Sequence, residues 1–160
     1  MRSMNNSTYE EELALHGKLV YTNVGTSMMP LLRQHRDLMI IQKRPEGRLK
    51  KYDAVLYKRG EKYILHRILR VRPQDYVICG DHCWRREFGV TDAQILGVLI
   101  GVVRDGKEIS VTDRKYLCYV HLWCDFYLIR AAILFAREKY WSLRQKLGIL
   151  KRKVQRKLLG

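Results

Sequence analysis

Short apolar segments separated by turn-forming residues make up most of residues 1–113. Turn chemistry at 58–61 and at Asp105-Gly106 predicts two hairpins. No helical pattern lies between the segments, and parallel strands would need such crossovers. We therefore predict a mainly β fold, either a folded-over antiparallel sheet or a partly open barrel. A short helix with an acidic first turn is predicted over 9–15, and strands over 18–24, 37–42, 52–57, 63–71, 76–79, 95–103 and 108–111.

The composition changes after residue 113. Residues 116–136 are apolar and aromatic, but His121, Asp125 and Arg130 interrupt them. A charge near the bilayer centre costs about 2.5–3.5 kcal/mol, so we expect this segment not to span a membrane. Apolar residues then recur at steps of three and four opposite Lys and Arg, which predicts a basic amphipathic helix. Its apolar positions are Tyr140, Leu143, Leu147, Leu150, Val154 and Leu158.

These patterns divide the chain into a β domain, residues 1–113, and a helical extension, residues 114–160, that is first apolar and then basic. The whole chain has 31 Lys and Arg against 16 Asp and Glu, a formal net charge of +15. Such an excess predicts attraction to an anionic partner: nucleic acid, a lipid surface or an acidic peptide. Residues 137–160 hold nine of the basic residues and one acid, so the charge is densest there.

The four cysteines predict reduced thiols rather than a disulfide framework, because no secretory leader precedes them. Cys79, His82 and Cys83 are close enough in sequence to raise the question of zinc. The set lacks a fourth ligand and its spacing fits no standard ligand pair, so we predict no metal site.

Ser27 lies in the segment Gly25-Thr26-Ser27-Met28-Met29-Pro30, and His66 lies in an alternating apolar segment about forty positions later. Glycine and proline around Ser27 favour a turn that exposes a backbone N–H and a hydroxyl together. A serine hydroxyl is a poor nucleophile until a base takes its proton, and a histidine on a neighbouring strand can do so. An isolated serine would more often be an ordinary polar turn residue, so the interpretation depends on the motifs around it.

A series of motifs over residues 19–103 resembles, in order and spacing, the boxes of the signal peptidase I family. The boxes are Gly25-Thr26-Ser27-Met28-Met29-Pro30, Arg36-Asp37-Leu38-Met39-Ile40-Ile41, Lys51-Tyr52-Asp53-Ala54-Val55-Leu56-Tyr57, Leu65-His66-Arg67-Ile68-Leu69, Gly80-Asp81 and Ile95-Leu96-Gly97-Val98. The resemblance implies the fold of signal peptidases and LexA-type repressors. It also implies a serine endopeptidase that removes a leader or signal-like segment without a metal or organic cofactor.

The resemblance also implies roles for individual residues. Ser27 corresponds to the nucleophile, and His66 stands where the family carries a lysine or, as in its endoplasmic-reticulum-type branch, a histidine as general base. Imidazole suits this role, since its ordinary pKa is about 6.5. The carboxylate that orients His66 is Asp81, our first choice, or Glu87, which stands near the position of an aspartate in the histidine branch. Arg67 is expected to pair with an acid or a carbonyl.

Several neighbours of Ser27 have expected supporting roles. The family usually has a hydroxyl residue at the position of Gly25. An oxyanion hole would therefore depend on the Ser27 N–H, with Thr26 as a helper. Met28 and Met29 are expected to pack the site or line a substrate pocket.

Residues 1–17 contain three consecutive glutamates and no apolar run, so we expect no signal peptide or N-terminal anchor there. The expected location is cytoplasmic, either free or peripheral on the inner face of the cell membrane. Residues 117–158 could lie on an anionic membrane surface or pack against a protein partner. Nucleic acid is disfavoured, because 17 residues are too few for a repressor's DNA-binding domain. The alternative function is a non-catalytic, regulatory peptidase-like module that docks to such a membrane or partner.

Overall fold

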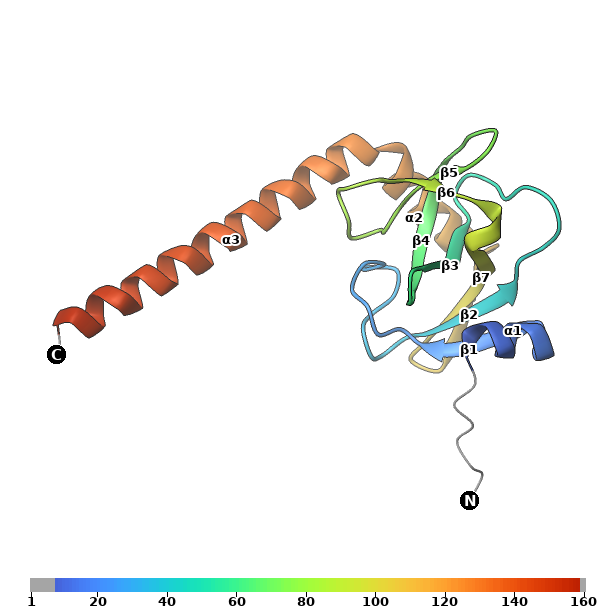
Figure 1. Cartoon of the computed structure of the whole chain (residues 1–160), viewed down its shortest axis with the longest axis horizontal. Coiled ribbons are helices and arrows are strands. Elements are labelled where there is room, and N and C mark those ends of the chain that lie inside the picture. Colours follow the sequence, from blue (N-terminus) through green and yellow to red (C-terminus); the bar gives the residue numbers. More distant parts are fainter. Residues whose placement is uncertain (1–7, 159–160) are drawn as a thin grey trace, which may run out of the picture.

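The computed structural model describes residues 8–158 as an antiparallel β body with a short helix before it and two helices after it (Figure 1). The predicted mainly β fold is confirmed. The elements are α1 (Tyr9–His16), β1 (Lys18–Thr22), β2 (Leu38–Lys43), β3 (Ala54–Arg59), β4 (Lys62–Val71), β5 (Tyr76–Cys79), β6 (Glu87–Val90), the 3-10 helix η1 (Asp92–Gln94), β7 (Ile95–Arg104), β8 (Lys107–Ser110), α2 (Arg114–Asp125) and α3 (Tyr127–Leu158).

The strands form one open sheet in the order β1-β2-β7-β3-β4-β5-β6, and β8 pairs with the end of β7. Each neighbouring pair is antiparallel. Every predicted strand is present, with ends that differ by at most two residues. The strand β6 was not predicted, because Glu87-Phe88-Gly89-Val90 lacks an apolar run and contains a glycine.

The sheet has a hydrophobic core on each of its faces, and β3 contributes to both. Ala54 and Leu56 belong to a core with α1, β1 and the segment after β1, whereas Val55 and Tyr57 belong to a second core with β5 and η1's neighbour Ile95. Successive strand residues point to opposite faces, so a strand buried on both faces is apolar throughout. The sheet is therefore covered on both faces, although it is open at its edges.

The helix α2 packs on the sheet through one side. Tyr116, Val120 and Cys124 are buried and are spaced by four residues, so they share a helix face. They contact partly buried residues that include Leu69 and Val111. The helix α2 thus packs on the β body, even though it begins after residue 113, where the composition changes.

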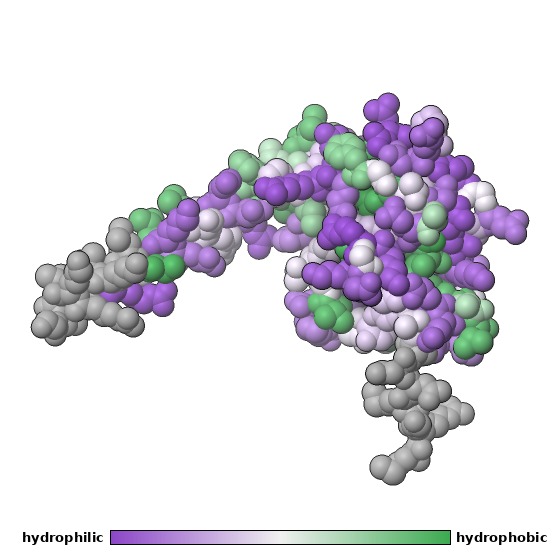
Figure 2. Space-filling view, in the orientation of Figure 1, coloured by the Kyte–Doolittle hydropathy of each residue, from purple (hydrophilic) through white to green (hydrophobic). Residues whose placement is uncertain are grey.

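The helix α3 leaves this body and extends away from it (Figure 1). Its first turns are fastened: Arg130 is buried, and the Tyr127 hydroxyl donates to the Trp84 carbonyl at 2.6 Å. Farther out, apolar and hydrophilic residues alternate along its surface (Figure 2). Tyr140, Leu143 and Leu147, three of the predicted apolar positions, are exposed, so their side chains do not pack against the β body. The side chains of the other three predicted apolar positions, Leu150, Val154 and Leu158, lie outside the described residues.

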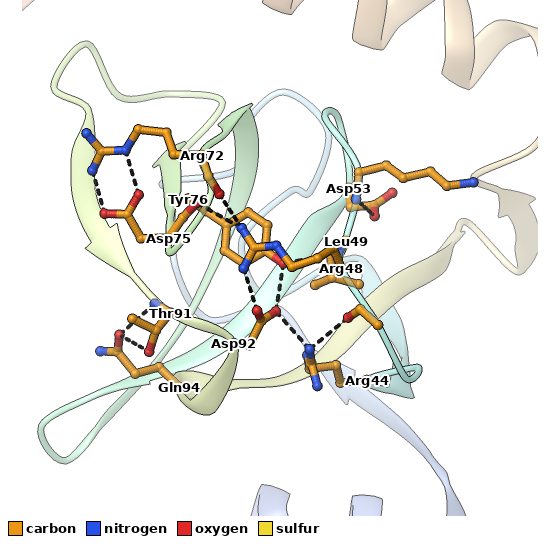
Figure 3. A network of polar contacts seen from close by, with 12 residues as sticks. Arg44, Arg48, Leu49, Asp53, Arg72, Asp75, Tyr76, Thr91, Asp92 and Gln94 are labelled. Carbon is orange, nitrogen blue, oxygen red and sulfur yellow. Dashed lines mark hydrogen bonds and ion pairs between the residues drawn. The ribbon is translucent and has the colours of Figure 1, made fainter.

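A polar network centred on Asp92 joins the end of the β6 region to the loop before β3 (Figure 3). Asp92 accepts hydrogen bonds from Arg44, Arg48 and Tyr76. Burial alone would raise the pKa of Asp92, but these donors outweigh it and lower the pKa to about 2. The Tyr76 hydroxyl also accepts from the Leu49 N–H at 3.0 Å, so one hydroxyl links the loop to the carboxylate.

We predict that Tyr76→Phe lowers the free energy of unfolding by about 1–3 kcal/mol, because it leaves the buried Leu49 N–H without its acceptor. Chemical denaturation measures the change. Tyr140→Phe is the matched control, since Tyr140 is exposed. Equal stability of the two variants would contradict the role of this hydroxyl.

Candidate active site

Ser27 lies on a tight turn in the connection between β1 and β2. The Met29 N–H donates to the Thr26 carbonyl at 3.1 Å and closes the turn around Ser27. Among the hydrogen bonds of the described residues, none uses the Ser27 N–H or the Ser27 hydroxyl. Both groups are therefore free to act on a bound molecule, as the turn prediction required.

The base of this connection is held by buried polar groups. Asn23 donates through Nδ2 to the Gly25 carbonyl at 2.7 Å. Asp37 accepts from Arg33 Nε at 2.9 Å and from Arg104 Nη2 at 2.7 Å. Burial would raise the pKa of Asp37, but the hydrogen bonds from Arg104 and Arg33 lower it to about 2. The carboxylate stays charged at neutral pH and fixes the Ser27 connection to β7.

Gly80 brings Ser27 and His66 together. A Cβ on Gly80 would lie 2.6 Å from the Ser27 carbonyl oxygen and 2.9 Å from His66 Nε2, so only glycine fits between them. The two distances limit the separation between that oxygen and that nitrogen to 5.5 Å. The His82 N–H also donates to the Ser27 carbonyl at 2.7 Å. The structure therefore places the Ser27 main chain beside the His66 ring.

The other nitrogen of His66 faces Glu87. Nδ1 lies 3.0 Å from Glu87 Oε1, and the imidazole side chain is 8% exposed. A carboxylate only accepts hydrogen bonds, so this contact favours the tautomer with hydrogen on Nδ1 and a free lone pair on Nε2. Burial lowers the pKa of His66 below its ordinary 6.5, while the Glu87 charge opposes that shift. The lowered pKa makes the ring neutral at neutral pH.

Asp81 does not contact His66, and our first choice of Asp81 as the orienting carboxylate is corrected. Arg67 Nε donates to Asp81 Oδ1 at 2.9 Å and Arg67 Nη2 to Oδ2 at 2.7 Å, and both side chains are fully buried. Tyr119 on α2 adds a third hydrogen bond, at 2.9 Å. The Asp81 carboxylate thus pairs with Arg67, the residue that follows His66. The expected pairing of Arg67 with an acid is confirmed.

Two residues that the sequence analysis missed hold Glu87 in place. The Tyr57 hydroxyl donates to Glu87 Oε2 at 2.9 Å, and Arg59 Nη1 donates to the same oxygen at 2.7 Å. Oε1 is thereby left for His66. Tyr57 and Arg59 are two positions apart on β3 and so share a face of that strand. Their partner, Glu87, comes from β6, and no local sequence pattern predicts that contact.

A pocket of about 180 Å³ opens beside Ser27. Its walls come from α1, the end of β1, the Ser27 turn and β4, and they include Tyr9, Gly25, Met28 and Leu65. Met28 lines the pocket, as expected, whereas Met29 is not among the lining residues. A Cβ on Gly25 would meet nothing within 4 Å, so the space above this residue is open to a ligand. Thr26 is exposed on the same turn.

Within residues 8–158, no group of three or more His, Cys, Asp or Glu side chains is arranged to hold a metal ion. Comparisons of the chain with protein-family models, curated proteins and solved structures give no match.

We predict that Asp81→Asn lowers the free energy of unfolding by about 3–5 kcal/mol, because it leaves the buried Arg67 charge without its partner. Urea denaturation measures this. Asp75→Asn is the control, since Asp75 pairs with the partly exposed Arg72 and a solvent-screened pair of this kind contributes little to stability. A smaller loss for Asp81→Asn than for Asp75→Asn would contradict the assignment.

Proposed function

We propose that the protein is a serine endopeptidase that cleaves a leader or signal-like segment from a peptide or protein. The observation that supports this most is the succession Glu87, His66, Ser27 across the site. Glu87 contacts Nδ1 of the imidazole, and the opposite nitrogen, Nε2, faces the Ser27 turn. This is the order in which an acid, a base and a nucleophile act in acyl transfer.

The reaction follows from these positions. Ser27 Oγ attacks the substrate carbonyl while His66 Nε2 takes the hydroxyl proton. The Ser27 N–H donates to the negatively charged oxygen that develops, and Glu87 stabilises the imidazolium. His66 then gives its proton to the leaving amine. In the second half of the reaction His66 takes a proton from water, which attacks the acyl-enzyme, and returns a proton to Ser27 Oγ as the acyl group leaves. The Ser27–His66 hydrogen bond forms when substrate closes the site, since catalytic hydrogen bonds are often long without substrate.

The pocket beside Ser27 supports an extended substrate with a small side chain next to the cut. At about 180 Å³ it is smaller than the pockets that usually hold drug-sized ligands. Within residues 8–158, β1 pairs only with β2, so its outer edge could add a substrate strand that leads to the Ser27 turn.

We predict that the wild-type chain cleaves peptides with small residues at the cut, and that Ser27→Ala or His66→Ala abolishes cleavage. Because protonated His66 is inactive and its pKa is lowered, kcat/KM should rise with pH through a midpoint below 6.5 and then stay level. Glu87→Gln removes the charge that raises this pKa. It should move the midpoint lower and reduce kcat by at least about 100-fold.

Mass spectrometry of the products measures cleavage, and the pH profile of kcat/KM measures the midpoint. Arg114→Ala is the control, since this exposed residue lies outside the site. Cleavage by Ser27→Ala and His66→Ala at the wild-type rate would rule out the proposed mechanism.

The exposed apolar side chains of α2 and α3 favour a second function, docking on an anionic lipid surface. Leu128 is 77% exposed and Ile133 is 62% exposed, and Leu122 and Phe126 are also exposed at the corner between the helices. Contiguous apolar surface of this kind marks an interaction site. Exposed Lys and Arg follow farther along α3, beginning with Arg137 and Lys139, and each contributes about 1 kcal/mol near anionic headgroups. This surface would serve a peripheral peptidase or the alternative non-catalytic module.

No single helix within residues 8–158 has both the length and the apolarity to cross a bilayer. The bent pair Arg114–Asp125 and Tyr127–Ile149, with 76° between its two helices, passes that test by length and composition only.

We predict that the chain floats with vesicles that contain phosphatidylglycerol and not with neutral phosphatidylcholine vesicles. Leu143→Glu/Leu147→Glu should weaken this binding by at least about tenfold, because it replaces two apolar contacts with charges. The matched control is Leu15→Glu/Val20→Glu, which adds the same charges at exposed sites on the β body. Equal weakening by both pairs would contradict docking through α3.

A further inference from the structure

A second recess lies between the loop after β5 and the helix α3. It has a volume of about 320 Å³ and is lined by His82, Trp84, Leu134, Arg137, Glu138 and Trp141. Its connection to the candidate nucleophile is direct, because the His82 N–H donates to the Ser27 carbonyl. The pocket with Tyr9 and Leu65 has Ser27 itself in its wall. One backbone hydrogen bond therefore joins a wall residue of this recess to Ser27, which lines the other pocket.

The wall formed by α3 is fastened to the loop. Trp84 Nε1 donates to Glu138 Oε2 at 2.6 Å, and the Trp84 and Phe135 rings meet edge to face with centroids 5.0 Å apart. The Tyr127 hydroxyl, about two turns before Phe135 on α3, donates to the Trp84 carbonyl. The recess is thus built by contacts between residues far apart in sequence.

The basic charge lies on the α3 wall and beyond it. The recess itself holds one cation, Arg137, and one carboxylate, Glu138, which accepts the Trp84 hydrogen bond, but nine basic residues stand against this one acid in residues 137–160. The pKa of His82 is lowered by burial and by Arg137, so His82 is neutral at neutral pH. Arg137 is exposed, and among the described residues it forms no ion pair. Arg144 lies seven residues farther along α3, on the same side of the helix, with its guanidinium 5.6 Å from the Trp141 ring. Two arginines and a tryptophan therefore lie on the α3 wall of the recess and on the turns that follow it.

We propose that this recess and the adjoining turn of α3 bind an acidic segment of the substrate. The segment lies across the scissile bond from the residue that occupies the pocket beside Ser27. The proposal rests on the proposed peptidase function and narrows its substrate class. Arginine pairs well with carboxylates, and an extended peptide can enter a recess between a loop and a helix that a flat bilayer cannot.

The test measures peptide binding to Ser27→Ala protein by fluorescence anisotropy. The probes are labelled peptides in which an alanine segment precedes or follows a run of glutamates, each with a glutamine counterpart. We expect the better glutamate probe to bind about tenfold more tightly than its counterpart at low salt. Arg137→Ala/Arg144→Ala should reduce this preference to below about threefold. The control, Arg114→Ala/Lys115→Ala, removes the same charge from exposed sites at the start of α2.

No preference for glutamate, or equal loss in both double variants, would overturn the proposal. It would also fail if an oligonucleotide lost as much affinity as the peptide in Arg137→Ala/Arg144→Ala, since the surface would then attract any polyanion. The binding result does not depend on cleavage, so a wild-type chain that cleaves nothing removes the peptidase function separately. Cleavage with equal kcat/KM for peptides with glutamate and with glutamine segments would remove only the acidic preference.

Discussion

The buried ion pair between Arg67 and Asp81 is the interaction on which the site depends. Each residue has a direct sequence neighbour in the site: His66 precedes Arg67, and Gly80 precedes Asp81. The two hydrogen bonds between guanidinium and carboxylate fix the loop after β5 against β4. Tyr116, at 3.0 Å from Arg67 Nη1, adds α2 to the same centre. A pair with no solvent exposure tolerates little displacement, so the positions of the neighbouring residues are also fixed.

The two carboxylates near His66, those of Asp81 and Glu87, lie in different environments. Asp81 is fully buried and accepts hydrogen bonds from an arginine and a tyrosine, and among the hydrogen bonds of the described residues none joins it to His66. Glu87 is partly exposed and keeps one oxygen for the imidazole while Tyr57 and Arg59 hold the other. Asp81 holds Arg67 and the loop after β5 in position, whereas Glu87 supports proton transfer in the proposed reaction.

Local patterns predicted the strands, the Ser27 turn and the helix at 9–15, because alternation and turn chemistry are properties of short segments. They could not choose between Asp81 and Glu87. That choice depends on the register of β5 and β6, in which Ile78 pairs with Glu87, and β6 itself has no apolar pattern. The recess between Trp84 and α3 was likewise beyond prediction, since its contacts join residues more than forty positions apart.

The central claim is that His66 is a neutral base with its Nδ1 hydrogen directed at Glu87 and its Nε2 free toward Ser27. Nitrogen-15 NMR of the imidazole as a function of pH tests this directly, with Glu87→Gln as the comparison. The account predicts a pKa below 6.5 and the Nδ1–H tautomer at neutral pH in the wild-type chain, with a lower pKa in the variant. A hydrogen on Nε2 at neutral pH, or a pKa of His66 that does not respond to Glu87→Gln, would contradict it.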